Sequence, residues 1–180
     1  MFLKVQVADS SGKSLEFADA LEKAINLIVN RTSKGCKVIF IGNGGSASIA
    51  SHQAVDFFKN GSVRAIAFND SSLLTCLSND FGYQYVFEKP IEMFAEKGDV
   101  LVAISSSGKS ENILRGADAA KNKGCHVITM SGFKPDNPLR SRGELNFYVP
   151  SDSYGYVEIT HLTLCHCMVD TIVGKQQDAK

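Results

Sequence analysis

The amino-acid sequence predicts an α/β protein with a doubly wound parallel sheet and helices on both faces. Three observations lead to this prediction. Apolar runs alternate along the chain with segments of helical spacing. The apolar run at residues 100–104 is continuous and contains β-branched residues, as expected for a strand that is buried on both faces. The length of 180 residues fits one domain with a substantial core, so we expect a single domain over residues 1–180.

The first third of the chain is expected to supply a helix, a strand, a turn and a second helix. Residues 1–13 carry little pattern. An N-terminal helix is expected over about residues 14–33, because apolar side chains recur there at helical spacing: Leu15, Ala18, Leu21, Ala24, Ile25 and Ile28. A strand at 38–41 precedes the glycine-rich turn at 42–47. The helix after that turn reaches Phe58 and can be capped by Ser46 or Ser48.

The remaining elements continue the alternation. We expect a short strand at 65–68, a short helix that Ser71 and Ser72 can cap, and another helix over about 85–95. After the strand at 100–104, a helix reaches about residue 123, strands follow at 126–130 and 145–149, and a final helix spans about 156–173. The sheet core therefore covers about residues 37–150. Ligands of such sheets bind outside the carboxyl ends of the strands, which directs attention to the turns after residues 41 and 104.

The turn after the strand at 38–41 reads Gly42-Asn43-Gly44-Gly45-Ser46-Ala47. Glycines at such a turn can take positive φ values, and their missing β-carbons let a ligand approach the backbone. The following helix directs its free N–H groups at that ligand, so the turn is interpreted as a phosphate cradle. A tight strand-to-helix connection that binds nothing is the alternative.

The turn after the strand at 100–104 contains Ser105, Ser106, Ser107 and Ser110. Its hydroxyls and N–H groups can surround a monoester phosphate at a second helix N-terminus, although serine clusters also occur as plain solvated turns. A nucleotide cofactor is not expected. The loose dinucleotide fingerprint at 42–47 lacks a well-placed acidic partner, since Asp70 comes late, and Ala103 occupies the position where a Walker A motif needs glycine.

Charge and hydropathy exclude several classes of partner. Nineteen basic and nineteen acidic residues give a formal net charge of zero, which offers no general attraction for nucleic acid. No apolar run approaches the roughly 20 residues that span a bilayer, and no signal segment precedes the first helix. We therefore expect a cytoplasmic protein that contacts neither nucleic acid nor a membrane.

Several separate motifs, in one order, resemble the sugar isomerase (SIS) domain family, and within it the sedoheptulose-7-phosphate isomerases (phosphoheptose isomerases). The resemblance runs from the first helix nearly to the C-terminus. It rests on the two turns, on the helix that carries His52, on the segment at 77–83, on 98–101, on 127–129 and on the C-terminal helix with Glu158, His161 and His166.

The resemblance implies a phosphorylated sugar as the ligand. The phosphate would be held by Ser105, Ser106, Ser107 and Ser110, and the sugar would be contacted by Asp80 and by the turn of Asn43, Gly44, Gly45 and Ser46. The family reaction interconverts a ketose phosphate and an aldose phosphate through an enediol, which requires one group to remove a proton beside a carbonyl and another to protonate oxygen.

The resemblance also implies acid–base and metal-binding roles for four residues. His52, Asp56, Glu158 and His166 occupy the positions where some family members bind zinc, and Asp56, Glu158 and His166 are the expected catalytic groups. Two of the four depart from the family pattern. Asp56 replaces a glutamate and so shortens the reach of the base, and Glu158 replaces a glutamine. Gly155 falls where the family has an aspartate.

Each of these side chains also has an ordinary structural interpretation. Helix histidines are often simply hydrogen-bonded, Asp56 and Glu158 could be solvated carboxylates, and His161 could point into the site or toward a subunit contact. The leading hypothesis is a heptose-type phosphosugar isomerase, assembled as a homo-oligomer and most commonly a tetramer in this family. The alternatives are an isomerase for another phosphoketose and a non-catalytic SIS protein that binds a phosphosugar or a protein partner.

Overall fold

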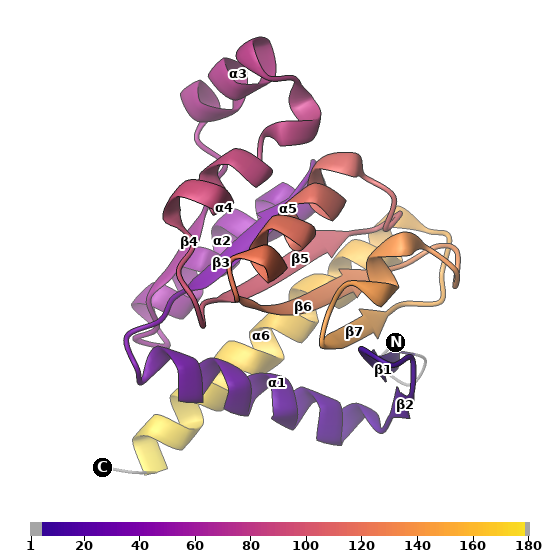
Figure 1. The fold of residues 1–180 in the computed structure, drawn as a ribbon. Helices are drawn as coiled ribbons and strands as arrows, with labels where there is room; N and C mark the ends of the chain where they lie inside the picture. The colour runs from indigo at the N-terminus through magenta and orange to yellow at the C-terminus, as the bar shows by residue number, and fades with distance from the viewer. Residues whose placement is uncertain (1–4, 179–180) are drawn as a thin grey trace.

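A computed structural model describes residues 5–178 and shows one seven-stranded sheet in the order β2-β1-β7-β6-β5-β3-β4 (Figure 1). The ends of the predicted range 1–180 lie outside the described residues. The strands are β1 (Gln6–Asp9), β2 (Ser14–Leu15), β3 (Val38–Gly42), β4 (Ala65–Ala67), β5 (Val100–Ser105), β6 (His126–Ser131) and β7 (Leu145–Tyr148). Strands β3 to β7 are parallel, so the predicted α/β fold class is confirmed.

The N-terminal hairpin of β1 and β2 was not predicted, because residues 1–13 carry little sequence pattern. Strand β1 pairs antiparallel with β7, and β2 pairs antiparallel with β1. In this hairpin only Val7 is buried, because the two strands are short and lie at the border of the sheet. Such a hairpin leaves almost no hydrophobic pattern in the sequence. Helix α1 (Phe17–Thr32) accordingly begins at residue 17 rather than at about residue 14.

Helices cover both faces of the sheet (Figure 1). Helices α1, α2 (Gly45–Lys59) and α6 (Tyr154–Asp178) pack with Val38, Phe40 and Val102 in one core. Helices α4 (Glu88–Phe94) and α5 (Glu111–Asn122) pack with Ile39 and Leu101 in the other. Side chains alternate between the faces of a strand, so both cores are built from the same strands. The helix α3 (Ser71–Asp80) has no buried residue and projects from the body of the molecule.

Several predicted boundaries and caps are wrong in detail. Helix α2 is capped by Gly44 rather than by Ser46 or Ser48, and α3 is capped by Asp70, whose carboxylate accepts the N–H of Leu73 at 3.0 Å. The helix expected over about 85–95 is divided into a 3₁₀ turn, η2 (Tyr83–Tyr85), and α4. A second 3₁₀ turn, η3 (Pro138–Ser141), lies in the loop before β7. No helix in the described range 5–178 has the length and apolar character needed to cross a membrane.

Two features of this fold bring distant residues together. Strands β3 and β5 are adjacent and in register, with Gly42 opposite Ile104, so both turns emerge at the same edge of the sheet. Helices α2 and α6 run side by side in the same direction. Gly45 lies against Glu158, Gln53 against His166, and the Gly61 carbonyl accepts a hydrogen bond from Gln176. The fold therefore aligns the beginning and the middle of α2 with those of α6.

His161 is a core residue, which corrects the expectation that it points into the site or toward a subunit contact. It is fully buried on α6, and its Nε2 lies 3.2 Å from the carbonyl oxygen of Ser131. Burial lowers the pKa of His161 to about 4. In the unfolded chain, His161 takes up a proton near the ordinary histidine pKa of about 6.5. The folded protein therefore keeps the full contribution of this group to its stability above that pH and loses that contribution as the pH falls toward 4.

Replacing His161 by glutamine is therefore expected to make the protein less sensitive to acid. Between pH 7 and pH 4, the wild type should lose about 3 kcal/mol more unfolding free energy than the variant. Urea unfolding at several pH values measures this difference. The carboxylates are present in both proteins, so their contributions to the pH dependence of the unfolding free energy cancel when the two profiles are compared. Parallel pH profiles for the two proteins would contradict the assignment of His161 as a buried neutral group.

Candidate functional site

The glycine turn and the serine turn line one cavity of about 220 Å³ at the carboxyl edge of the sheet. Its lining residues come from the two turns and from the first turn of α6: Asn43, Gly44, Gly45, Ser46, Ser105, Ser106, Ser107, Ser110, Tyr154 and Glu158. The structure therefore brings together eight of the nine residues expected to bind substrate. The ninth, Asp80, lies exposed at the end of α3 and does not line this cavity.

Three helices begin at the wall of this cavity. Gly45 is the first residue of α2, Ser110 is the N-cap of α5, and Tyr154 is the first residue of α6. Helix N-termini carry unpaired N–H groups and a partial positive charge, so an anion is stabilised where several of them meet. The cavity has no side-chain cation among its lining residues. Anion stabilisation in this cavity would therefore come from backbone N–H groups and serine hydroxyls, and the Glu158 carboxylate opposes it.

The glycine turn depends on the absence of side chains. Gly44 has a φ of +53°, and a β-carbon at Gly42 would collide with the backbone of Ser46. Asn43 is held from two sides. Its amide exchanges hydrogen bonds of 2.9 Å in both directions with Asn112, and its Oδ1 also accepts the hydroxyl of Tyr83 at 2.9 Å. These contacts tie the glycine turn to α5 and to η2 before any ligand binds.

The serine turn holds its hydroxyls in place with local hydrogen bonds. Ser105 Oγ accepts the N–H of Gly108 at 3.2 Å, and Ser107 Oγ accepts the N–H of Lys109 at 3.2 Å. The hydroxyl of Ser106 is buried and has no hydrogen-bond partner among the described residues. A buried polar atom without a partner costs free energy, and a ligand oxygen in the cavity would supply the missing partner.

Glu158 lies in the cavity and not with the other expected metal ligands. Its carboxylate covers Gly45 so closely that a β-carbon there would lie 2.5 Å from each of its three carboxyl atoms. His166 follows eight residues later on α6, about 12 Å along the helix axis. Of the four expected ligands, the structure therefore groups three and separates Glu158 from them.

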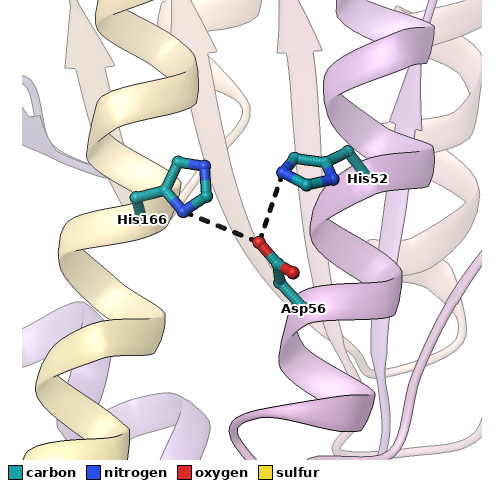
Figure 2. A group of neighbouring side chains, drawn as sticks. All are labelled: His52, Asp56 and His166. Carbon is teal, nitrogen blue, oxygen red and sulfur yellow. Dashed lines mark ion pairs between the residues drawn. The ribbon is translucent and has the colours of Figure 1, made fainter.

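The three grouped residues are His52, Asp56 and His166, which face one another across α2 and α6 (Figure 2). Asp56 Oδ2 lies 3.3 Å from His52 Nε2 and 3.6 Å from His166 Nδ1. The imidazole rings meet edge to face with centroids 5.4 Å apart. His52 and Asp56 are neighbours because residues four apart share a helix face. Asp56 is 16% exposed, while the side chains of His52 and His166 are 54% and 35% exposed.

This triad is chemically suited to a divalent transition metal. One potential ligand atom from each residue lies within 4.8 Å of the other two. Imidazole nitrogen and carboxylate oxygen are ordinary zinc ligands, and a three-residue set leaves a position for substrate or water. The residues present therefore fit a zinc ion, and they also fit acid–base work without one.

Two residues that contribute to the site were given no site role in the sequence analysis. Tyr154 lines the cavity and stacks edge to face on Phe133 at 4.7 Å. Tyr83 reaches Asn43 from an exposed 3₁₀ turn. An aromatic residue at a helix start is common, so Tyr154 carries no distinctive signal, and Tyr83 has only its place in the segment at 77–83. Asn112 has one weak signal, its place in the motif that follows the serine turn.

Residues 9–132 match the sequence model of the SIS domain family. The chain belongs to the SIS domain family. Two curated SIS relatives are phosphoheptose isomerases, from Citrifermentans bemidjiense at 36% identity and from Serratia proteamaculans at 38% identity. The match to the first covers 87% of this chain and 84% of the relative, and the match to the second covers 86% and 82%.

A solved SIS structure agrees with these relatives. Phosphoheptose isomerase GmhA from Neisseria gonorrhoeae superposes with a TM-score of 0.80 at 32% identity, over 86% of each chain. The resemblance to the phosphoheptose isomerases is thus confirmed in sequence and in fold.

Proposed function

We propose that this SIS protein is a phosphosugar aldose–ketose isomerase that interconverts sedoheptulose 7-phosphate and D-glycero-D-manno-heptose 7-phosphate. The observation that carries the proposal is the spacing of two sites along the paired helices α2 and α6. The anion cavity lies at Gly45 and the triad begins at His52, seven residues or about 10 Å farther along α2. An extended sugar chain from phosphorus to carbon 2 of a heptulose 7-phosphate has a length of about 9 Å. A seven-carbon substrate can therefore occupy both sites at once.

In this arrangement the cavity would bind the phosphate, and the triad would carry out the proton transfers. The N–H groups of the glycine turn and the hydroxyls of the serine turn would hold the phosphate and orient the sugar chain. The carboxylate of Asp56 would remove the proton from carbon 1, while His166 would supply a proton to the oxygen on carbon 2 to give the enediol. Removal of the proton from the oxygen on carbon 1 and return of a proton to carbon 2 would complete the aldose.

A zinc ion, if used, would be held by His52, Asp56 and His166 and would polarise the substrate oxygens. Support for this role is the grouping of the three ligand atoms within 4.8 Å. Glu158 lies with the phosphate cavity, so a metal role for it would require its side chain to turn along α6 away from Gly45.

The proposal is tested by a coupled assay of the purified protein on sedoheptulose 7-phosphate, with added zinc, without it and after chelation. We expect turnover that a His166→Ala variant loses. Phosphosugar binding without turnover, for wild-type protein under all three conditions, would contradict the isomerase proposal and favour a phosphosugar-binding regulator.

Glu158 yields a prediction about phosphate itself. A carboxylate beside Gly45 repels a dianion at the same helix N-terminus, so Glu158→Gln is expected to tighten the binding of inorganic phosphate about tenfold. Titration calorimetry at pH 8 measures the affinity. Glu22→Gln, on the exposed side of α1, makes the same change in net charge away from the cavity. Equal affinities of the wild type and Glu158→Gln for inorganic phosphate would show that phosphate binds outside this cavity.

We further propose a homo-oligomer, with a tetramer as the expected form. Large apolar side chains are exposed on both helices that carry the triad: Val55 at 54% and Phe58 at 66% on α2, and Ile159 at 55% on α6. Exposed large apolar side chains are common at subunit interfaces. Light scattering coupled to size-exclusion chromatography tests the assembly, and Phe58→Glu should reduce it.

A further inference from the structure

Gln53 is a fully buried polar side chain on α2, directly beside the triad. It follows His52 in the sequence but turns to the opposite environment, since His52 is exposed and Gln53 is 0% exposed. Its amide nitrogen Nε2 lies 3.2 Å from His166 Nε2, and its Oε1 is buried with no partner among the described residues. A buried amide with an unpaired oxygen is costly, so its contact with His166 requires an explanation.

The two nitrogens of His166 have different neighbours. Nδ1 faces the carboxylate of Asp56 at 3.6 Å, and Nε2 faces the amide of Gln53. A neutral imidazole has one N–H donor and one acceptor nitrogen, a carboxylate can only accept, and an amide NH₂ can only donate. Both neighbours therefore favour the same tautomer, with the proton on Nδ1 and the lone pair on Nε2.

We propose that Gln53 is a positioning residue that fixes the ring orientation and the tautomer of His166. By donating to Nε2 it keeps the Nδ1 edge turned toward Asp56 and His52, where the triad is assembled (Figure 2). The role of Gln53 in catalysis rests on the proposed isomerase function. The position of the proton on His166 does not rest on that function, because the neighbouring groups set it in the protein without substrate.

The unpaired Oε1 of Gln53 has a place in the same proposal. If His166 uses Nδ1 to bind a metal, the proton must move to Nε2, which then becomes a donor. A half-turn of the Gln53 amide presents Oε1 to that N–H and satisfies both groups. Outer contacts of this kind orient metal-binding histidines, and their loss typically weakens metal binding 10- to 100-fold. Gln53 can thus support His166 in both tautomers.

The first experiment measures the tautomer of His166 directly. Imidazole ¹⁵N spectra of the metal-free protein at pH 8.5, assigned with His166→Gln, should show the proton on Nδ1 in the wild type. Gln53→Met removes the amide with little change in volume and should shift His166 toward the tautomer with the proton on Nε2. Phe57→Leu alters another fully buried residue of α2 and should leave the His166 spectrum unchanged. A wild-type ring protonated on Nε2, or spectra that Gln53→Met does not change, would overturn the proposal.

The second experiment measures zinc affinity by competition with a chromogenic chelator, without substrate or turnover. We expect Gln53→Met to weaken zinc binding at least about tenfold. Gln53→Glu restores an acceptor for the Nε2–H of His166 and should recover most of that loss. Equal zinc affinities for the wild type and for Gln53→Met would overturn the role of the amide in supporting the ring. Because neither readout uses the isomerase reaction, its failure would be distinguishable from failure of this proposal.

Discussion

Replacing Asp56 by alanine is expected to lower kcat for sedoheptulose 7-phosphate about a thousandfold. The Asp56 carboxylate lies between the two histidines of the triad, at 3.3 Å from His52 and 3.6 Å from His166. Its loss removes the proposed base and the negative charge between the two imidazole rings. A positioned acid–base group typically contributes 10²- to 10⁴-fold to a rate. Steady-state kinetics of the purified variant measures this effect.

Two further variants make the Asp56 result specific. Asp170→Ala removes an exposed carboxylate from α6 and should leave kcat unchanged. Asp56→Glu lengthens the side chain by one methylene, and it should retain more activity than Asp56→Ala because it still carries a carboxylate. Thermal unfolding of each variant monitors the fold. An Asp56→Ala protein with wild-type kcat would remove Asp56 from the proposed chemistry.

The second large effect is expected at the serine turn. Replacing Ser107 and Ser110 by alanine together should weaken the binding of sedoheptulose 7-phosphate at least about a hundredfold, because hydrogen bonds to a charged group contribute about 1.5–3 kcal/mol each. Both hydroxyls line the cavity, and neither lies in a hydrophobic core cluster, so the fold should be retained. Titration calorimetry with the His166→Ala background measures binding without turnover.

The matched control for the serine variant removes two hydroxyls elsewhere. Ser33 and Ser141 are exposed and lie outside the cavity, so their joint replacement by alanine should leave affinity unchanged. Equal affinities for the serine-turn variant and this control would show that the phosphate binds at another position. Weaker binding of inorganic phosphate by the serine-turn variant, in parallel with the sugar phosphate, would assign the loss to the phosphate group.

The turns and the fold class were predictable from the sequence because each has a local signal. A strand buried on both faces is a continuous apolar run, as at residues 100–104, and a glycine turn after such a run has few other uses. The grouping of His52 with Asp56 follows from their spacing on one helix. These inferences need no knowledge of how distant segments meet.

The rest depends on contacts between helices. The burial of Gln53 is set by the side of α2 that meets α6, and no periodicity in the sequence reveals which partner lies there. The placement of Glu158 over Gly45 depends on a side-chain conformation and on the register of α6 against α2, neither of which a motif encodes. The burial of His161 could not be predicted for the same reason, because it is a property of the packed helix and not of its neighbours in sequence.

The N-terminal hairpin has a consequence for how the protein meets other molecules of its kind. All four residues of β7 are buried, and the antiparallel pairing with β1 occupies one side of its backbone. Without that pairing, β7 would be an apolar edge strand with free N–H and C=O groups, which is a template for intermolecular strand addition and aggregation. The new edge is the two-residue strand β2, preceded by a polar turn in which Asp9 accepts the N–H groups of Ser11 and Lys13. Among the described residues, the hairpin thus replaces a buried edge strand with a short one at this border of the sheet.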